Sequence, residues 1–260
     1  MKASESNPNY PSKVREMTNY TIREIKKVCK DIGPRPSGEE NERKAQDYVA
    51  DSMSKVADSV VKEKFELHPK AFMGWVPLDV ILMTISIVLT LLSYFDVLPS
   101  ASTAFSVVSV VLTSLAIIFT FFEFLLYKKF LDPFFPKRET YNVVCTRKAA
   151  GETKRRIVFS GHIDSAYEWY FTHLGGGKLL TTMIALAFGA IAITLAASIV
   201  SFFDVPNGVR VTAIVVLFVC LIPILMCSKF VNWKLCVPGA NDNLTGVFAS
   251  MSVLRYMAAN

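Results

Sequence analysis

The sequence predicts an α/β domain, with a mixed sheet and flanking helices, that is interrupted by two transmembrane helical hairpins. Two observations indicate this class: four long stretches almost without charge, and helix and strand patterns in the polar segments between them. Hydrophobic residues make up 52% of the 260 residues and charged residues only 19%, whereas about a quarter of a soluble domain is charged. The composition therefore combines a membrane part with one modest soluble domain.

The four apolar stretches are each long enough for a transmembrane helix, which needs about 20 residues. They cover residues 76–94, 105–127, 179–203 and 209–229. Short connections rich in turn-forming residues, 95–104 and 204–208, join them in pairs. We therefore expect one hairpin at 76–127 and another at 179–229. The polar segments 1–75, 128–178 and 230–260 then form one domain, the first with helices and a strand, the second with central strands, the third with a loop and a helix.

Both hairpins leave the polar domain and return to it, so the polar segments share one side of the membrane. That side carries 27 of the 28 Lys and Arg residues, counting Lys229 at the end of the fourth stretch, and Arg210 lies on the other side. Cytoplasmic loops concentrate these residues, so we predict a multi-pass membrane protein whose polar domain faces the cytoplasm. Asp79 and Glu123 lie near the ends of their stretches and are expected to reach the membrane interface; the alternative is a functional acid inside the membrane.

The polar segments carry the patterns of three helices and three strands. The helices are expected at 18–31, from the cap at Ser37 to about residue 56, and at 243–257, and the strands at 59–67, 141–148 and 155–162. Ser37 and Glu40 have the S-x-x-E spacing of a capping box for the second helix. The first strand alternates as a half-buried strand does, with Val61 and Phe65 on one face. The third contains the run IVFS, apolar on both faces, which predicts a central strand covered on both sides.

Composition and cysteine spacing argue against other classes. The net charge of +6 would suit nucleic acid, but basic and acidic residues are interspersed, so attraction to the lipid bilayer is the simpler explanation and no nucleic-acid partner is predicted. The five cysteines form no C-x-x-C pair and are expected to be reduced and structural, with zinc thiolates or disulfides as alternatives. Residues 1–20 are polar and charged, and we do not expect them to be a secretory signal peptide.

Two short motifs carry residues that could do chemistry. In SGHIDS, residues 160–165, His162 and Asp164 are two positions apart and point to the same face of an extended chain. This suits a metal ligand and a supporting carboxylate, although an ordinary strand end is the alternative. In PGANDNLTG, residues 238–246, Asp242 lies where a helix begins, and a simple helix cap is the alternative. We expect the three side chains to meet at one mouth of the sheet.

Three segments in order resemble a known family. GPRPSGEENERKAQDYV, IVFSGHIDS and PGANDNLTGV, which begin at Gly33, Ile157 and Pro238, are similar to successive segments of the co-catalytic zinc aminopeptidases of peptidase family M-28. The resemblance implies a zinc-peptidase-like fold and a peptide substrate, with His162 as a zinc ligand, Asp164 as the active-site carboxylate and Asp242 as the ligand that bridges two zinc ions. Such ions activate a water molecule and polarise the peptide carbonyl.

Other residues of the family pattern have no counterpart in this sequence. The family also uses a Glu-Glu pair, which supplies a ligand and the general base, and a later Asp and His. We therefore expect the chain to be the N-terminal part of a longer enzyme, inactive by itself; a degenerate relative without catalysis is the alternative. The predicted function is that of a membrane-bound zinc metallopeptidase, an aminopeptidase. The rival is a non-catalytic membrane receptor or scaffold. A small transporter is less consistent with spans whose polar residues are mainly Ser and Thr.

Overall fold

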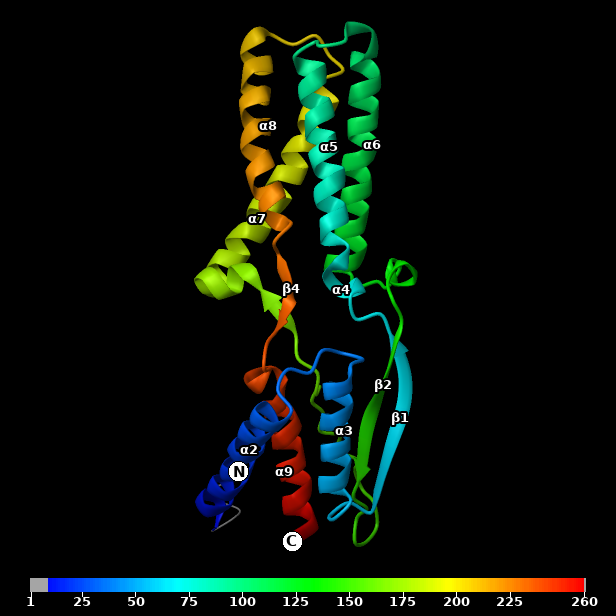
Figure 1. Ribbon diagram of the computed structural model, residues 1–260, viewed down its shortest axis with the longest axis vertical. Helices are drawn as coiled ribbons and strands as arrows, with labels where there is room; N and C mark the ends of the chain where they lie inside the picture. Colours follow the sequence, from blue (N-terminus) through cyan, green and yellow to red (C-terminus); the bar gives the residue numbers. More distant parts are fainter. Residues whose placement is uncertain (1–8, 260) are drawn as a thin grey trace. The chain divides into compact units, whose positions relative to one another are not determined.

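A computed structural model describes residues 9–259 (Figure 1). By its internal contacts the chain divides into two compact units, which we call the polar unit and the helical unit. The polar unit consists, within the described part, of residues 9–69, 137–167 and 233–259. The helical unit consists of residues 70–136 and 168–232. Each unit is thus built from segments far apart in the sequence, and the chain passes from one to the other four times.

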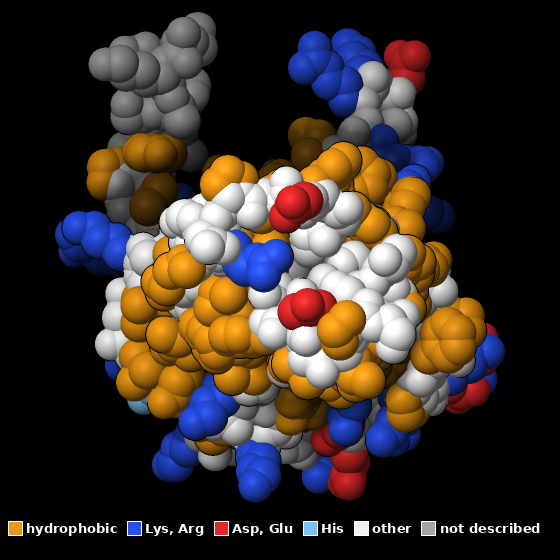
Figure 2. Space-filling model, turned by 90° about the horizontal axis from the view of Figure 1, so that it is seen from above, with side chains coloured by type: hydrophobic (Ala, Val, Ile, Leu, Met, Phe, Trp, Pro, Cys, Tyr) orange, Lys and Arg blue, Asp and Glu red, His pale blue; other side chains and the backbone are white. Residues whose placement is uncertain are grey.

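The helical unit contains four helical stretches long and apolar enough to cross a membrane, consistent with a multi-pass membrane protein. The first is α4 (Ala71–Gly74) continued by α5 (Val76–Tyr94), and the second runs from the short η1 (Pro99–Ala101) through α6 (Ser102–Phe119) to the π-helix η2 (Thr120–Leu125). The third and fourth are α7 (Tyr170–Val200) and α8 (Asn207–Cys227). A 3-10 turn, η3 (Asp132–Phe134), follows the second. Figure 2, seen from above, shows hydrophobic side chains gathered around the end of the helical unit.

The third stretch begins earlier than the sequence predicts. We expected it to start at residue 179, but α7 starts at Tyr170, and Gly175 and Gly176 interrupt its helical geometry with φ of −148° and 64°. Such a φ at Gly176 is accessible to glycine at little cost. The apolar helix therefore follows a short preceding turn of helix across a kink.

A cluster of hydroxyl side chains fills the interior of the helical unit between α5, α6 and α7. Thr90 donates or accepts hydrogen bonds with Ser109 at 2.6 Å and with Ser198 at 2.8 Å, and Ser86 bonds to Ser109 and to Thr113. All five side chains are buried. Small hydroxyl residues let helices approach closely and satisfy one another where lipid offers no partner, so this cluster joins the helices.

Asp79 and Glu123 lie near the ends of their helical stretches, as the sequence indicates, and both side chains are buried among the helices. Asp79 is 7% exposed and Glu123 is 8% exposed. Thr120 donates a hydrogen bond to Asp79 Oδ2 over 2.7 Å, and the amide of Leu131 donates to Glu123 Oε1 over 2.9 Å. Each of these carboxylates thus accepts a hydrogen bond from a protein group within the helical unit.

The polar unit consists of three helices and an antiparallel pair of strands that share one core. Its helices are α2 (Tyr10–Asp31), α3 (Glu40–Met53) and α9 (Thr245–Ala259), the last preceded by η4 (Ala240–Leu244). Strand β1 (Ser59–Leu67) pairs with β2 (Arg138–Thr146), in a register that sets Ser59 opposite Thr146 and Leu67 opposite Arg138. The buried core is formed by Val28, Ala45, Val49, Met53, Leu244, Val247, Phe248 and Met251. The predicted helices and the first two strands are confirmed, although α2 begins earlier than expected.

The predicted central strand at 155–162 is wrong. Residues 152–166 belong to no helix or strand, and Ile157, Val158 and Phe159 are 65%, 80% and 52% exposed. A strand exists through hydrogen bonds to its neighbours, and within the described residues no backbone bond pairs this segment with another strand. The mixed sheet is therefore not observed. In its place are two two-stranded sheets, β1 with β2, and β3 (Tyr167–Trp169) with β4 (Val231–Cys236).

Two local expectations about the polar unit are also wrong. Glu39 and not Ser37 precedes the first turn of α3, and no side chain caps it, because the Ser37 hydroxyl donates to Asp164 instead. The face of β1 that carries Val61 and Phe65 is turned outward, with these side chains 51% and 39% exposed. The opposite face, with Val60, packs on the core, since this is the side that α3 covers.

Candidate metal centre

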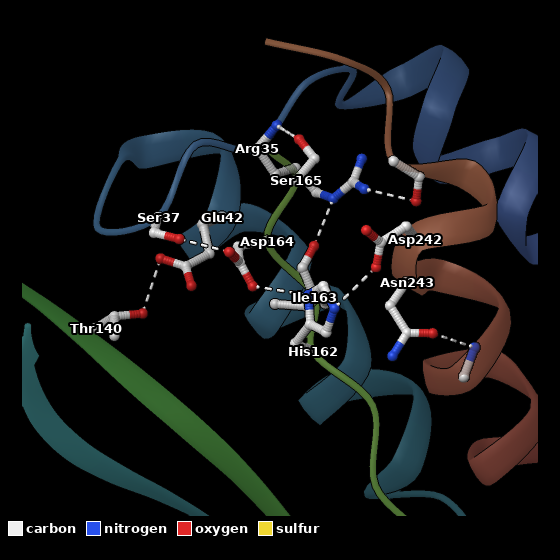
Figure 3. Close-up of polar contacts among 12 residues, drawn as sticks. Arg35, Ser37, Glu42, Thr140, His162, Ile163, Asp164, Ser165, Asp242 and Asn243 are labelled. Carbon is white, nitrogen blue, oxygen red and sulfur yellow. Dashed lines mark hydrogen bonds and ion pairs between the residues drawn. The ribbon is translucent and has the colours of Figure 1, made fainter. Parts of the chain in front are cut away.

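Arg35 lies at the junction of the three segments that carried the family resemblance (Figure 3). Its side chain is fully buried. The guanidinium donates from Nε to the carbonyl of Ile163 over 2.8 Å, from Nη1 to that of Gly33 over 2.6 Å, and from Nη2 to that of Pro238 over 2.9 Å. Burial lowers the pKa of Arg35, but a guanidinium stays charged at neutral pH. One cation thus ties the loop after α2 to the two motifs.

Two glycines allow the motif segments to approach closely. A Cβ on Gly161 would lie 2.5 Å from the amide nitrogen of Val247, so the backbone before His162 rests on the first turn of α9. Gly239 has φ of 61°, and a Cβ there would lie 2.6 Å from Cβ of Ser165. A larger residue at either position would separate the two motifs.

Asp242 does not cap α9. The side chain of the next residue, Asn243, accepts a hydrogen bond from the amide of Gly246 over 3.0 Å, which is the contact of a helix cap. The Asp242–Asn243 peptide bond is cis. The cap that we considered as the alternative role of Asp242 is therefore formed by its neighbour, and the Asp242 carboxylate is available for other contacts.

The structure brings His162, Asp164 and Asp242 together (Figure 3). His162 Nδ1 lies 3.1 Å from Asp164 Oδ1, and His162 Nε2 lies 3.0 Å from Asp242 Oδ1, across 80 residues of sequence. The side chain of His162 is 53% exposed and that of Asp242 is 79% exposed. The cluster is thus open to solvent, as a site that receives a metal ion and a substrate must be.

Each ring nitrogen of His162 faces a carboxylate oxygen. This arrangement restricts which atoms or ions can lie between a nitrogen and its facing oxygen. A neutral imidazole carries a proton on one nitrogen and a lone pair on the other. If Nδ1 donates to Asp164, the lone pair of Nε2 points at the negative oxygen of Asp242, which is repulsive. A cation between Nε2 and Asp242, either a second proton or a metal ion, converts this repulsion into attraction.

Residues missed at the sequence level surround Asp164. Ser37 donates a hydrogen bond to Asp164 Oδ2 over 2.5 Å. Nearby, buried Glu42 accepts from the amide of Gly38 over 2.6 Å and from the hydroxyl of Thr140 over 2.8 Å, and burial raises its pKa. The only signal for these roles was that Ser37 and Glu42 lie in the first segment of the family resemblance.

His162 and Asp242 offer the kinds of donor atom that zinc binds in proteins. Zinc takes His nitrogen and carboxylate oxygen, and a His ligand usually donates its other N–H to a carboxylate, as His162 can to Asp164. His162 Nε2 and Asp242 Oδ1 are close enough to bind the same ion. Catalytic zinc usually has three protein ligands, and residues 9–259 contain no group of three or more His, Cys, Asp or Glu arranged to hold a metal. The structure thus provides two ligating atoms and one orienting carboxylate.

Comparisons with known proteins add no assignment to this geometry. No protein-family model, curated protein or solved structure matches the chain.

Proposed function

We propose that the polar unit carries part of the active site of a membrane-bound zinc metallopeptidase, an aminopeptidase that acts on peptides. The observation that supports this most directly is the placement of His162 between Asp164 and Asp242, with a carboxylate 3.0–3.1 Å from each ring nitrogen. In this proposal His162 and Asp242 bind zinc, with two zinc ions in the complete site, and Asp164 is the carboxylate beside the metal.

The side chains have separate tasks. Asp164 keeps the proton of His162 on Nδ1, which leaves the lone pair of Nε2 for the metal. Ser37, by donating to Asp164, limits the rotation of that carboxylate. Zinc, when bound, lowers the pKa of a water molecule and polarises the carbonyl of the peptide. The remaining ligands and the general base are not among the described residues, so we expect no peptide hydrolysis from these residues alone.

Zinc binding to the purified chain tests the proposal. Replacing either proposed ligand, in His162→Ala or Asp242→Ala, should weaken zinc binding about tenfold or more in competition with a coloured chelator. His173→Ala is the matched control, because His173 also lies near a carboxylate, with Nδ1 3.4 Å from Glu168, but belongs to the helical unit. Equal zinc binding by all four proteins would remove His162 and Asp242 from the metal site.

A receptor or scaffold that keeps a peptidase-like unit without catalysis is the second candidate. The small number of donor atoms favours it, since two ligands hold zinc less firmly than the usual set. Turnover of an aminoacyl chromogenic substrate by the longest natural form of the protein separates the two. Zinc-dependent turnover that disappears in Asp164→Ala supports the enzyme, and its absence in a zinc-loaded protein supports the receptor.

We further propose that the polar unit faces the cytoplasm. The support is the distribution of positive charge: 27 of 28 Lys and Arg residues lie on the polar side of the four apolar stretches. Labelling of Ser100→Cys with a membrane-impermeant thiol reagent in intact cells tests this, because Ser100 lies in the connection between the first two stretches. Labelling before permeabilisation is expected, and labelling only afterwards would reverse the orientation.

A further inference from the structure

A half-open pocket of about 80 Å³ lies between the apolar helical stretches of the helical unit. Its walls come from α5, η2, α7 and α8, from residues just before α5 and from Phe230 after α8. The surface that these walls present is almost all apolar, and Ile184, Ala187 and Phe188 on α7 are only half-buried. Apolar helices in a membrane are surrounded by lipid, so acyl chains are the neighbours that can reach this pocket.

Three aromatic rings form one part of the wall. The ring centroid of Phe124 lies 6.4 Å from that of Trp75 and 6.2 Å from that of Phe188. Trp75 is 5% exposed, and its indole Nε1 donates to the carbonyl of Phe72 over 3.0 Å, which fixes the ring. Rigid rings of this kind make many favourable dispersion contacts with a hydrocarbon chain.

Positive charge lies at the same end of the helical unit as the pocket. Lys70 comes three residues before Met73, and Lys229 directly before Phe230, and both Met73 and Phe230 line the pocket. The two lysines are exposed. At the other end of the same helical stretches the charged residues are Asp96, Asp204 and Arg210. The pocket is therefore flanked by cations that an anionic headgroup can reach.

The charges decide which lipid is preferred. In a bilayer, an acyl chain gains little from leaving its neighbours for a protein surface, because lipid is as apolar as the pocket. Selection between lipids therefore depends on the headgroup. Lysines near a membrane surface attract anionic lipids. A zwitterionic headgroup carries its own cation beside the phosphate and is attracted less.

We propose that this pocket binds an anionic phospholipid of the surrounding membrane, with part of one acyl chain against Trp75 and the phosphate near Lys70 and Lys229. An apolar cavity of about 150 Å³ holds one benzene molecule, so this smaller pocket takes a few carbons of the chain and the rest lies along the helices. The site belongs to the helical unit alone and does not depend on His162 or Asp242.

Quenching of Trp75 by bromine atoms on the acyl chains tests the proposal, because bromine quenches tryptophan on contact. The chain has three tryptophans, so Trp169→Phe and Trp233→Phe leave Trp75 as the single emitter. In maltoside micelles, brominated phosphatidylglycerol should quench Trp75 saturably, and unbrominated phosphatidylglycerol should restore the emission. Brominated phosphatidylcholine should need about tenfold higher concentration or more.

Variants in this single-tryptophan background separate the pocket from the charges. Ala187→Phe, which fills the pocket from α7, should abolish saturable quenching by both lipids while helicity is kept. Lys70→Gln and Lys229→Gln should each weaken binding of phosphatidylglycerol about fivefold and leave that of phosphatidylcholine unchanged.

The matched control is Lys26→Gln combined with Lys30→Gln, which removes two exposed charges from α2 of the polar unit. This protein should bind phosphatidylglycerol as the parent does. Equal affinity for the two lipids would overturn the proposal, as would saturable quenching that survives in Ala187→Phe. Weakening by the control as large as that by the variants of Lys70 and Lys229 would show attraction to net charge and no site at the pocket.

Discussion

Arg35 and Ser165 are hydrogen-bonded in both directions: the amide of Arg35 donates to the side-chain Oγ of Ser165 over 2.8 Å, and the amide of Ser165 donates to the carbonyl of Arg35 over 2.9 Å. Asp164 immediately precedes this contact. Together with the guanidinium bonds to Ile163 and Pro238, it fixes the segments that present the candidate metal ligands. The positions of those ligands thus depend on a buried residue that forms no hydrogen bond with their side chains.

Arg35→Ala should therefore destabilise the polar unit. The substitution removes the charged donor from the carbonyl groups of Gly33, Ile163 and Pro238, and a hydrogen bond to a charged group contributes about 1.5–3 kcal/mol. We expect the free energy of unfolding to fall by about 3 kcal/mol or more, measured by denaturant titration. Arg43→Ala, at an exposed position on α3, should change it by less than about 0.5 kcal/mol. Similar losses in both variants would contradict the assigned role.

Asp164→Asn should weaken zinc binding without removing a proposed ligand. The carboxylate that bonds to His162 Nδ1 orients the ring, and loss of such a partner commonly costs about 10–100-fold in metal affinity. Competition with a chelator measures the change. Asp47→Asn, which alters a carboxylate paired with Lys62 on the same unit, should bind zinc as the parent does. If Asp164→Asn also does so, Asp164 does not orient His162.

Glu42 should make the stability of the polar unit depend on pH. Burial raises its folded-state pKa above the usual 4.5, so the folded protein holds the proton more tightly than the unfolded chain. The free energy of unfolding contributed by this group is therefore present below 4.5 and is lost as pH rises through the folded pKa. Glu42→Gln should match the parent in acid and exceed it in stability as pH rises. A difference between the two that is constant from acid to neutral pH would refute this linkage.

Thr90→Val should loosen the helical unit. The substitution keeps the size of the side chain but removes the hydrogen bonds to Ser109 and Ser198 inside the hydroxyl cluster. Bonds of this kind between membrane helices contribute about 0.6 kcal/mol on average and at most about 1.7 kcal/mol each, so we expect a loss of about 1–2 kcal/mol in dodecyl sulfate unfolding followed by helicity. Thr212→Val is the control, because the hydroxyl of Thr212 is exposed and donates to the carbonyl of Gly208 in its own helix. Equal effects would mean that the cluster does not stabilise the packing.

The sequence predicts best those elements that depend on local properties. The first apolar stretch was placed at 76–94, and α5 covers the same residues, because length and hydropathy alone define such a helix. Strand β1 likewise occupies the expected residues 59–67, although the face expected to be buried is exposed. The strand expected at 155–162 depended on neighbours that local pattern cannot reveal, and none pairs with it among the described residues.

In the candidate site, too, local motifs could be predicted from the sequence and tertiary contacts could not. His162 and Asp242 were singled out from two motifs 80 residues apart, and their proximity follows from tertiary contacts such as that of Gly161 with α9. The S-x-x-E pattern indicated a helix cap for Ser37, whereas its hydroxyl bonds to Asp164. The central position of Arg35 could not be predicted at all, because its partners are carbonyl groups, which any residue possesses.

The uncovered segment around Ile157, Val158 and Phe159 has a consequence for how the protein behaves at high concentration. Free amide and carbonyl groups beside apolar side chains are a template for intermolecular β-pairing. Three consecutive cations, Lys154, Arg155 and Arg156, come directly before it and repel the same run on a second molecule. Salt weakens this repulsion, since the screening length falls to about 3 Å at 1 M. In detergent micelles the protein should therefore remain dispersed at low salt and self-associate as ionic strength rises.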